Sequence, residues 1–235
     1  AYVVLAKSRL VPVLRDLAPA TVLVQGDTAS AMAGCEAGVQ LDLPVVHIEA
    51  GLRTRCFSDP FPEETFRVQI ATLAALHFAP TEMARQNLLD EGVETPINVV
   101  GNTSVDALRL AGITPVPHED RQGVLVTLHR RESAAAIPHL LTGLNLWASE
   151  HPETPVTVVR HPNHYADTQL PFLRSVPPMA YPEFLSRLTR SQAALTDSGG
   201  LVEECATLGI PCGIARNHTE RPEALEAGYA RLSST

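Results

Sequence analysis

The sequence has 235 residues, of which 45% are hydrophobic and 19% are charged, and its formal net charge is −8. This composition is that of a folded protein with one large domain or two modest ones, and it excludes a disordered chain. The acidic balance argues against a nucleic-acid or anionic-membrane surface, because both require a concentrated basic patch.

Two further features bear on where the protein works. No run of 18 apolar residues is present, and the opening stretch "AYVVLAKSRLVPVL" lacks the small-residue cleavage site of a signal peptide and predicts a helix. The cysteines show neither CxxC spacing nor a dense framework, so we expect reduced thiols and a cytoplasmic location. These cysteines are Cys35, Cys56, Cys205 and Cys212.

Short β-branched runs alternate with helical patterns along the first half of the chain. The runs are continuous rather than alternating, which is typical of parallel strands covered on both faces. The predicted strands are 20–27, 43–50, 75–81 and 96–102, and the predicted helices are 30–41, 62–74, 82–92 and 104–112.

A segment rich in proline and charge, 113–122, is the best candidate for a linker, and the same rhythm returns after it. The second half has predicted strands at 123–129, 155–161, 193–198 and 211–217, and predicted helices at 136–150, at 182–191 and from 199 onward. We therefore predict an α/β fold with two doubly wound, Rossmann-like domains, 1–114 and 123–235, joined by the linker 115–122. Ligands of such sheets bind beyond the carboxyl ends of the strands, and we expect a cleft between the two domains.

Polar residues collect at the predicted carboxyl ends of the strands, and each has a structural as well as a functional interpretation. Asp27 and Thr28 follow the first strand and can form a helix N-cap. His47 and Glu49 close the next strand and can form a salt bridge with each other. The run that begins with His129 and Arg130 can be a solvated charge cluster.

The stretch "SDPFPEETFR", residues 58–67, leaves the same choice open. Glu63 and Glu64 follow a Pro-Phe-Pro segment, and Pro62 suits the first position of a helix whose dipole favours carboxylates. The alternative is a catalytic acid or base held on a rigid turn.

The stretch "LTDSGGLVEE" is more telling because two glycines stand at the entrance of a predicted helix. Gly199 and Gly200, after Ser198, allow the backbone to approach a ligand closely and leave amides free for phosphate oxygens. Glu204, about one turn into the helix, is placed to accept hydrogen bonds from ribose hydroxyls. No Walker loop, no GxGxxG and no Cys/His cluster with ligand spacing is present, so we expect neither a metal nor a redox cofactor.

Taken together, these groups predict an enzyme that acts on a nucleotide sugar. The first domain supplies carboxylates for proton transfer at a sugar, and the second supplies a diphosphate-binding helix start with cationic side chains. The carboxylates are Asp27, Glu49 and Glu63, and the candidate cations are His129, Arg130 and Arg216.

The same stretches resemble the non-hydrolysing UDP-N-acetylglucosamine 2-epimerases, whose two-domain architecture is also that of many glycosyltransferases of the B type. The matching motifs are "VLVQGDT", "HIEAGLRT", "PFPEETFR", "VVGNTSVDAL", "VTLHRRES", "LTDSGGLVEE" and "TERPEALEAG", in family order across nearly the whole chain. The resemblance implies that Asp27, Glu49 and Glu63 are catalytic carboxylates and that His129 is an essential histidine. It also implies that UDP is bound by Ser198, Gly199, Gly200, Glu204 and Arg216.

By this resemblance we expect the interconversion of UDP-N-acetylglucosamine (UDP-GlcNAc) and UDP-N-acetylmannosamine (UDP-ManNAc). The family eliminates UDP across C1–C2 to give 2-acetamidoglucal and then adds UDP back. Two alternatives stay open, a hydrolysing relative that releases UDP and free N-acetylmannosamine, and a nucleotide-sugar-binding protein without turnover. We expect UDP-GlcNAc or UDP as the partner, a homodimer, and no nucleic acid or membrane.

The sequence also departs from the family pattern. It starts after the family's "GTRPE"-type loop and ends before the closing helices, so we expect the first domain to lack its first strands and the second its last helices. Val202 stands where the family has Gln, and Val159 stands at a histidine position. These changes bear on the fine-tuning of substrate binding and on any allosteric nucleotide-sugar site.

Overall fold

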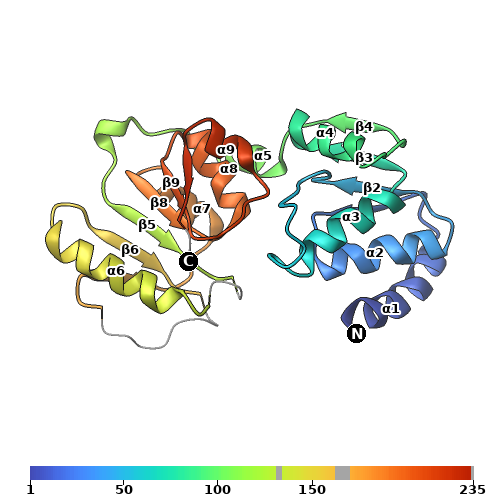
Figure 1. Cartoon of the computed structure of the whole chain (residues 1–235), viewed down its shortest axis with the longest axis horizontal. Coiled ribbons are helices and arrows are strands. Elements are labelled where there is room, and N and C mark those ends of the chain that lie inside the picture. Colours follow the sequence, from blue (N-terminus) through green and yellow to red (C-terminus); the bar gives the residue numbers. More distant parts are fainter. Residues whose placement is uncertain (131–133, 162–169, 234–235) are drawn as a thin grey trace. The chain divides into compact units, whose positions relative to one another are not determined.

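The computed structural model describes residues 1–130, 134–161 and 170–233, and within them the chain forms two compact units, 1–102 and 103–235 (Figure 1). None of the helices in these ranges is long and apolar enough to cross a membrane. Each unit is an α/β structure built on one parallel sheet, so the predicted pair of Rossmann-like units is confirmed.

The first unit contains a four-stranded sheet with the strand order β1-β2-β3-β4. Its elements are α1 (Tyr2–Leu17), β1 (Val22–Gln25), α2 (Ala29–Gln40), β2 (Val45–Ile48), α3 (Glu63–Leu73), β3 (Leu76–Ala79), α4 (Glu82–Asp90) and β4 (Ile97–Val99). Parallel pairing places Gln25 of β1 beside Ile48 of β2. The polar segments that follow these two strands therefore start from the same edge of the sheet.

The core of the first unit lies on one face of its sheet. Val24 and Val45 are buried there against Met32 of α2 and Ile70 of α3. On the other face Leu23 of β1 is 58% exposed, and the facing positions of β2 and β3 are half-buried. The continuous apolar runs of these strands are therefore buried fully on one face only.

The second unit has a six-stranded parallel sheet with the order β10-β9-β8-β5-β6-β7. Its elements are α5 (Thr103–Leu110), the 3₁₀ helix η1 (His118–Asp120), β5 (Val124–Thr127), α6 (Ile137–Glu150), β6 (Val156–Val159), β7 (Leu173–Val176), α7 (Tyr181–Leu188), β8 (Ala193–Thr196), α8 (Gly199–Leu208), β9 (Cys212–Ile214), α9 (Pro222–Glu226) and β10 (Ala230–Leu232). The edge strands β7 and β10 and the short helix α9 are additions to the predicted elements.

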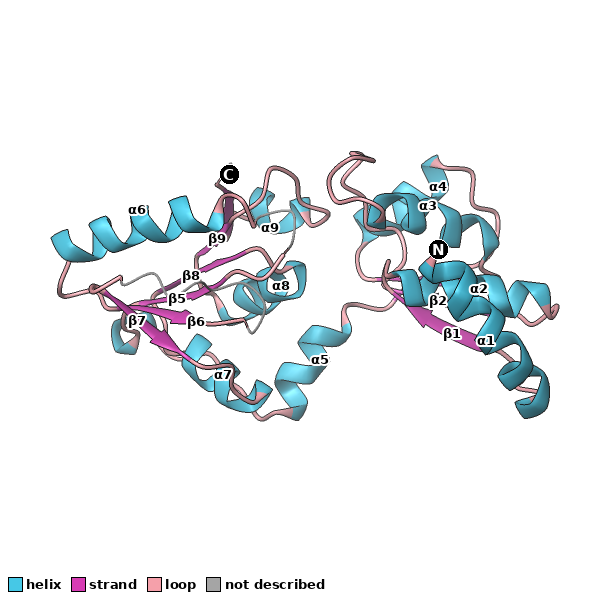
Figure 2. Cartoon of the chain, turned by 90° about the horizontal axis from the view of Figure 1, so that it is seen from below, coloured by secondary structure: helices cyan, strands magenta, loops and turns pink. Residues whose placement is uncertain are grey.

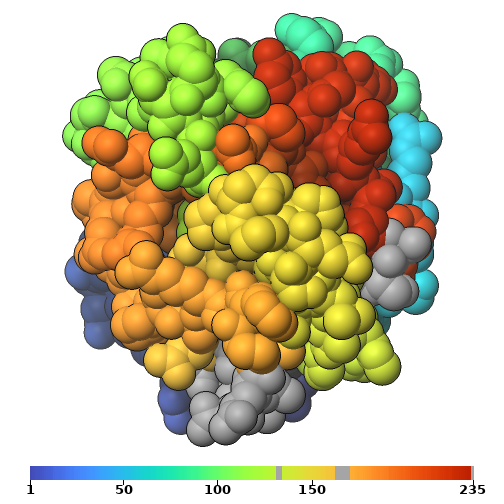
Figure 3. All heavy atoms as spheres, turned by 90° about the vertical axis from the view of Figure 1, so that its left-hand side faces the viewer, coloured from blue at the N-terminus to red at the C-terminus, as the bar shows by residue number. Residues whose placement is uncertain are grey.

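Both faces of the second sheet are covered by helices. Val126 and Val158 pack toward α6, whereas Leu125 and Ala194 pack toward α5, α7 and α8. Figure 2 shows α6 and α7 on opposite sides of these strands. The turn before β7 lies beside α6 (orange and yellow in Figure 3), where the backbone N–H of Phe172 donates to Asn145 over 3.0 Å.

The boundary between the units differs from the expected one, because 103–122 packs with the second unit. Leu108 of α5 is buried in the core of that unit. Arg121 is 6% exposed and donates to backbone carbonyls of Val116, Leu208 and Gly209 over 2.8, 2.8 and 2.5 Å. The guanidinium of Arg121 is also stabilised by the negative end of the α8 helix dipole, beside which it lies. The proline-rich segment is thus anchored rather than free.

We expect Arg121→Met to destabilise the second unit, because it leaves three backbone carbonyls without their donor. The free energy of unfolding should fall by at least about 2 kcal/mol, since one hydrogen bond to a charged group is worth roughly 1.5–3 kcal/mol. Urea unfolding followed by the fluorescence of Trp147, the sole tryptophan of the chain and a residue of α6, measures this unit.

The matched control is Arg109→Met. Arg109 is 79% exposed and lies 3.8 Å from Asp106, so its loss should change the free energy of unfolding by less than about 0.5 kcal/mol. Equal unfolding midpoints for the two variants would show that Arg121 does not anchor the segment.

Candidate active site

Asp27 lies just beyond the carboxyl end of β1. The chain turns there at Gly26, whose φ is +69°, a backbone conformation that glycine adopts without strain. The Asp27 carboxylate lies 2.5 Å from the guanidinium of Arg67 on α3, which is 4% exposed. Thr28, the next residue, caps α2 by accepting a hydrogen bond from the backbone N–H of Ala31. The cap interpretation is therefore correct for Thr28, while Asp27 has a different partner.

Glu49 lies one residue beyond β2 with φ of +63°, in the left-handed region. Asn102 donates to its Oε1 over 3.2 Å. A Cβ placed on Gly26 would lie 3.3 Å from Glu49 Oε2, so this carboxylate lies against the turn that carries Asp27. Two of the three predicted carboxylates are therefore neighbours at the edge of the sheet.

His47 takes no part in a salt bridge with Glu49, the pairing that the sequence left open. Its ring is buried and its Nε2 lies 2.9 Å from the carbonyl oxygen of Gly26. Burial lowers the pKa of His47 from 6.5 to about 4, against the opposing effect of this hydrogen bond. A neutral imidazole then donates from Nε2 and supports the turn before Asp27 from inside the core.

Glu63 and Glu64 both lie in the first turn of α3, after Pro62, so the helix-start interpretation is correct. Their surroundings differ sharply. Glu64 is 1% exposed and accepts hydrogen bonds from the backbone N–H groups of Thr54 and Arg55, over 3.1 and 2.8 Å. Oε2 of Glu63 is buried as well, yet it has no hydrogen-bond partner within the described residues.

The pKa of Glu64 is set by opposing effects. Burial raises it, but the hydrogen bonds from Thr54, Arg67 and Arg55 outweigh burial and hold the pKa below its ordinary value. Glu64 is therefore a charged acceptor, and both of its oxygens accept hydrogen bonds from the protein.

Gly51 closes the turn after Glu49 at a place where no other residue fits. Its φ is +86°, and a Cβ there would lie 2.1 Å from the carbonyl oxygen of Ala84 on α4. Asn87 of the same helix donates to the Gly51 carbonyl over 2.9 Å. Two residues later Arg53 is paired with Glu91 over 2.6 Å. The loop between β2 and α3 is thus held by α4.

In the second unit His129 follows β5 and is paired with Asp197, which follows the neighbouring strand β8. Asp197 is fully buried and accepts hydrogen bonds from the backbone N–H groups of His129 and Arg130, over 2.9 and 2.8 Å. Its other oxygen lies 3.1 Å from His129 Nδ1. Burial raises the pKa of Asp197, but His129 and the backbone donors lower it further, so the pKa lies below its ordinary value.

This pairing orients the imidazole. An ionised carboxylate accepts only, so Nδ1 of His129 carries the proton and Nε2 is left for a ligand. Asp197 was not selected from the sequence, although its place after a buried strand and before "SGG" was the available signal. The rest of the "HRRES" motif, 131–133, lies outside the described residues.

The two glycines at the start of α8 have different surroundings. A Cβ on Gly199 would lie 2.2 Å from Nη1 of Arg221 and 2.5 Å from Oε1 of Glu220, whereas a Cβ on Gly200 would meet no atom of the described part of the chain within 4 Å. The backbone N–H of Ser198 donates to the Thr196 hydroxyl over 3.0 Å. The open side of this helix start is therefore at Gly200, and Gly199 is required by the protein's own side chains.

A buried charge cluster lies beside that helix start. Arg216 is 6% exposed and pairs with Glu220 over 2.9 Å. Glu220 also pairs with Arg221, whose Nε donates to Glu203 of α8 over 2.8 Å. Ser104 of α5 donates to the other oxygen of Glu203 over 3.0 Å. The predicted UDP-binding cation Arg216 is thus part of a network in which charges of both signs alternate.

Glu204, the predicted ribose partner, accepts a hydrogen bond from the hydroxyl group of Tyr181 over 2.5 Å. Burial raises the pKa of Glu204 above its ordinary value, and the Tyr181 hydrogen bond opposes this. The pKa of Tyr181 is raised by burial and by Glu204. Tyr181 was not predicted from the sequence, because nothing at the start of α7 indicates that its hydroxyl group reaches Glu204 on α8.

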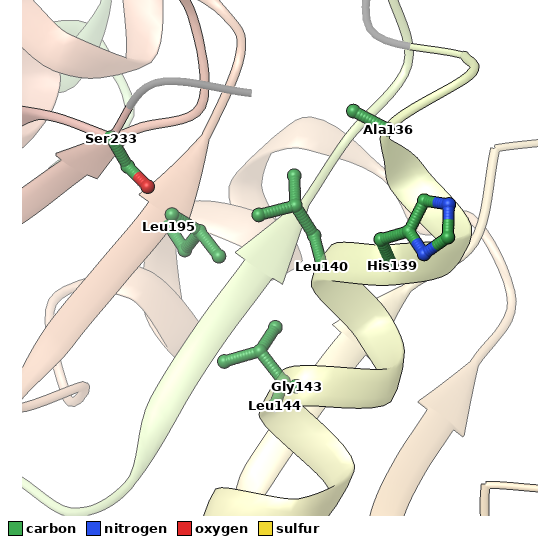
Figure 4. A pocket seen from close by; sticks show the side chains of 7 residues that line it. All are labelled: Ala136, His139, Leu140, Gly143, Leu144, Leu195 and Ser233. Carbon is green, nitrogen blue, oxygen red and sulfur yellow. The ribbon is translucent and has the colours of Figure 1, made fainter.

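A separate cavity of about 490 Å³ opens beside α6 (Figure 4). It is lined mainly by apolar side chains, and none of the predicted site residues contributes to it. The lining residues are Ala136, His139, Leu140, Gly143, Leu144, Leu195 and Ser233. Among the described residues, no group of three or more His, Cys, Asp or Glu side chains is arranged to hold a metal ion.

Comparisons with known proteins agree on one family. The family model described as UDP-N-acetylglucosamine 2-epimerase matches residues 3–235. The chain is 40% identical to a probable UDP-N-acetylglucosamine 2-epimerase of Ralstonia nicotianae over 95% of this chain and 66% of the relative. It is 37% identical to the UDP-N-acetylglucosamine 2-epimerase of Escherichia coli over 96% of this chain and 66% of the relative.

The solved structures agree with the sequences. The crystal structure of UDP-GlcNAc 2-epimerase from Neisseria meningitidis bound to UDP-GlcNAc matches with a TM-score of 0.89 and 34% identity, over 98% of this chain and 68% of that chain. The chain spans about two thirds of the length of the curated relatives it matches.

We expect Gly51→Ala to be among the most destabilising single substitutions in the first unit. It combines a left-handed backbone with a collision against the Ala84 carbonyl, and the free energy of unfolding should fall by more than about 3 kcal/mol. Gly92→Ala is the matched control, because its φ is +77° but its surroundings are open. It should cost only about 1–2 kcal/mol. Thermal melts of the two variants test this, and equal melting temperatures would contradict the collision.

We expect the first unit to lose stability in mild acid because of His47. Its folded pKa of about 4 lies below the ordinary 6.5, so the unfolded state binds more protons between these values. The free energy of unfolding should therefore fall by on the order of 3 kcal/mol as the pH drops from 6.5 to 4. His77, whose pKa burial also lowers, adds to the same trend.

His47→Gln keeps a donor for the Gly26 carbonyl and removes the titration. Hydrogen exchange of the β1 and β2 amides across this pH range should show a flatter profile for this variant than for the wild type. His139→Gln, on the exposed part of α6, should leave the profile unchanged. Identical profiles for His47→Gln and the wild type would contradict the prediction.

Proposed function

The chain belongs to the UDP-N-acetylglucosamine 2-epimerase family, and from that premise we propose that it interconverts UDP-GlcNAc and UDP-ManNAc. The observation that carries the proposal is the contrast between two adjacent carboxylates. Glu64 is saturated by hydrogen bonds, whereas Glu63 keeps a buried oxygen without a partner in the described structure. A buried acceptor without a partner is costly, so such an oxygen supports a role in contact with substrate.

The chemistry requires acid and base groups at C2 of the sugar. The hydrogen on C2 is not acidic, because no carbonyl group adjoins this carbon. Elimination of UDP across C1–C2 removes that proton and gives 2-acetamidoglucal. Protonation of C2 from the other face and return of UDP to C1 then complete the inversion. We assign these proton transfers to Asp27, Glu49 and Glu63.

The leaving UDP needs cationic and hydrogen-bonding partners that also retain it for the return step. His129, held at Nδ1 by Asp197, can donate from Nε2 to the diphosphate when both of its ring nitrogens carry protons. Arg216, Arg130, the hydroxyl group of Ser198 and the open helix start at Gly200 add further groups for the phosphates.

Glu204 provides the proposed contact to the ribose. A carboxylate has two oxygens, so Tyr181 and a ribose hydroxyl can share Glu204. The Tyr181 hydroxyl then fixes the direction in which the carboxylate faces the nucleotide.

The non-hydrolysing outcome is tested by incubating the protein with UDP-GlcNAc and following sugar and nucleotide products by NMR. We expect UDP-ManNAc at equilibrium with the substrate. Free N-acetylmannosamine with stoichiometric UDP would indicate a hydrolysing enzyme. Binding of UDP-GlcNAc without any product would indicate a binding protein and contradict the proposal.

We expect Glu63→Gln to lower turnover by about 10²–10⁴-fold, the usual contribution of a single acid or base group. The affinity for UDP should hardly change, because the proposed UDP groups lie in the other unit. Deuterium incorporation at C2 during turnover in D₂O, with a thermal melt as a folding check, measures the effect. The control Glu82→Gln alters a carboxylate in the first turn of α4 that is 78% exposed, and it should exchange at the wild-type rate. A folded Glu63→Gln protein that does the same would remove Glu63 from the mechanism.

The absence of a metal or redox cofactor, the homodimer and the cytoplasmic location stay predictions. Turnover in the presence of EDTA and without added NAD tests the expected independence of metals and redox cofactors. Light scattering tests the homodimer, and cell fractionation tests the cytoplasmic location.

A further inference from the structure

Glu64 does more in the structure than begin a helix. Its carboxylate accepts from the backbone N–H groups of Thr54 and Arg55 and from Nη1 of Arg67, over 3.1, 2.8 and 2.7 Å. Two of these donors belong to the main chain, which cannot swing away as a side chain can. The carboxylate is therefore a fixed acceptor for Arg67.

Arg67 passes this constraint on to Asp27. Nη1 of Arg67 donates to Glu64, and Nη2 lies 2.5 Å from Oδ2 of Asp27. A guanidinium is planar and rigid, so fixing one of its nitrogens restricts where the other can point. The Asp27 side chain is 25% exposed, whereas those of Arg67 and Glu64 are 4% and 1% exposed. The chain of contacts thus runs from a buried anchor to a carboxylate that solvent reaches.

We propose that Glu64 is a positioning residue, which fixes the orientation of the Asp27 carboxylate through the guanidinium of Arg67. The inference rests on the proposed function in one respect, the role of Asp27 in proton transfer at the sugar. Glu64 itself has no free oxygen for substrate and is not a catalytic residue.

A second Glu–Arg pair in the same unit shows what a helix start needs by itself. Glu82 and Arg85 have the same three-residue spacing in the first turn of α4, yet they are 78% and 42% exposed and 3.6 Å apart. Together with the cap that Thr81 provides, this exposed pair begins α4, so burial of such a pair is not required to begin a helix. Burial of the Glu64–Arg67 pair costs desolvation energy, so the pair must serve packing or function. The contact of Arg67 with Asp27 gives the pair a function, the positioning of the Asp27 carboxylate.

Substitution by glutamine should break the chain of contacts whichever way the amide turns. If its oxygen replaces Oε1, its NH₂ group faces the donors of Thr54 and Arg67. If its oxygen replaces Oε2, the NH₂ group faces the N–H of Arg55. At least one donor loses its acceptor in either orientation. Arg67 also loses its buried counter-charge and is freed to draw Asp27 out of place.

The test is a double-mutant cycle on kcat for epimerisation, built from Glu64→Gln and Asp27→Asn. We expect Glu64→Gln to lower kcat by about 10–100-fold, the size of effect that a misplaced catalytic group produces. UDP affinity, measured by isothermal titration, should stay within twofold. In the Asp27→Asn background the same substitution should lower kcat by less than threefold, because the group that it positions is already disabled. Glu82→Gln should leave kcat unchanged in both backgrounds.

A merely structural role gives a different pattern. It would lower kcat by the same factor in both backgrounds, which overturns the proposal, as does a Glu64→Gln variant with near wild-type kcat. If Glu64→Gln does not fold, the cycle is run with Glu64→Met/Arg67→Met, which removes both buried charges together, and is judged by the same factors.

If the wild-type protein shows no turnover, the proposed function fails and the inference about Glu64 is judged separately. The cycle is then measured on urea midpoints. A midpoint shift for Glu64→Gln that differs between the two backgrounds supports the coupling of Glu64 to Asp27, and equal shifts overturn it.

Discussion

A guanidinium ion that is buried in a small domain must find acceptors, and the first unit satisfies Arg67 with one carboxylate from its own helix and one from a strand end. This requirement fixes where α3 can lie. The contact between Arg67 and Asp27 holds the start of α3 at the carboxyl end of β1. The position of Glu63, one residue before Glu64, follows from the same constraint. Arg67 thus brings together the carboxylates of Asp27 and Glu64, and with Glu64 its neighbour Glu63.

Buried arginines organise the second unit too, with different acceptors. Arg121 is satisfied by backbone carbonyls at the end of α8, and Arg221 by carboxylates near its start. The end of α8 is therefore held by Arg121, which follows η1, and its first half by Arg221, which precedes α9. Such anchoring would favour the diphosphate binding that we propose for the first turn of this helix, because preorganised donors need not be ordered when the ligand arrives.

The sequence predicted most of the central strands, because β-branched runs between helical patterns are strong local signals. It missed β7 and β10, whose edge positions require fewer apolar residues, and whose residues are largely exposed. The linker was read from proline and charge, but those residues do not reveal that Arg121 reaches the end of α8. Within the candidate site, residue types near strand ends were enough to select Asp27, Glu49 and His129. The sequence did not select the partners of the site residues, because these contacts form only in the folded chain and sequence spacing does not show them. These partners are Arg67, Asn102, Asp197 and Tyr181.

The two glycines that open α8 offer different latitude to protein engineering. At 199 the space that a side chain would fill is already taken by Arg221 and Glu220. Substitutions at this position would therefore displace the ion pair between these two residues. At 200 no atom of the described residues lies within 4 Å of that space. Variation there can add a contact or a charge at the helix start without disturbing the scaffold, and it is the place to begin a search for altered nucleotide preference.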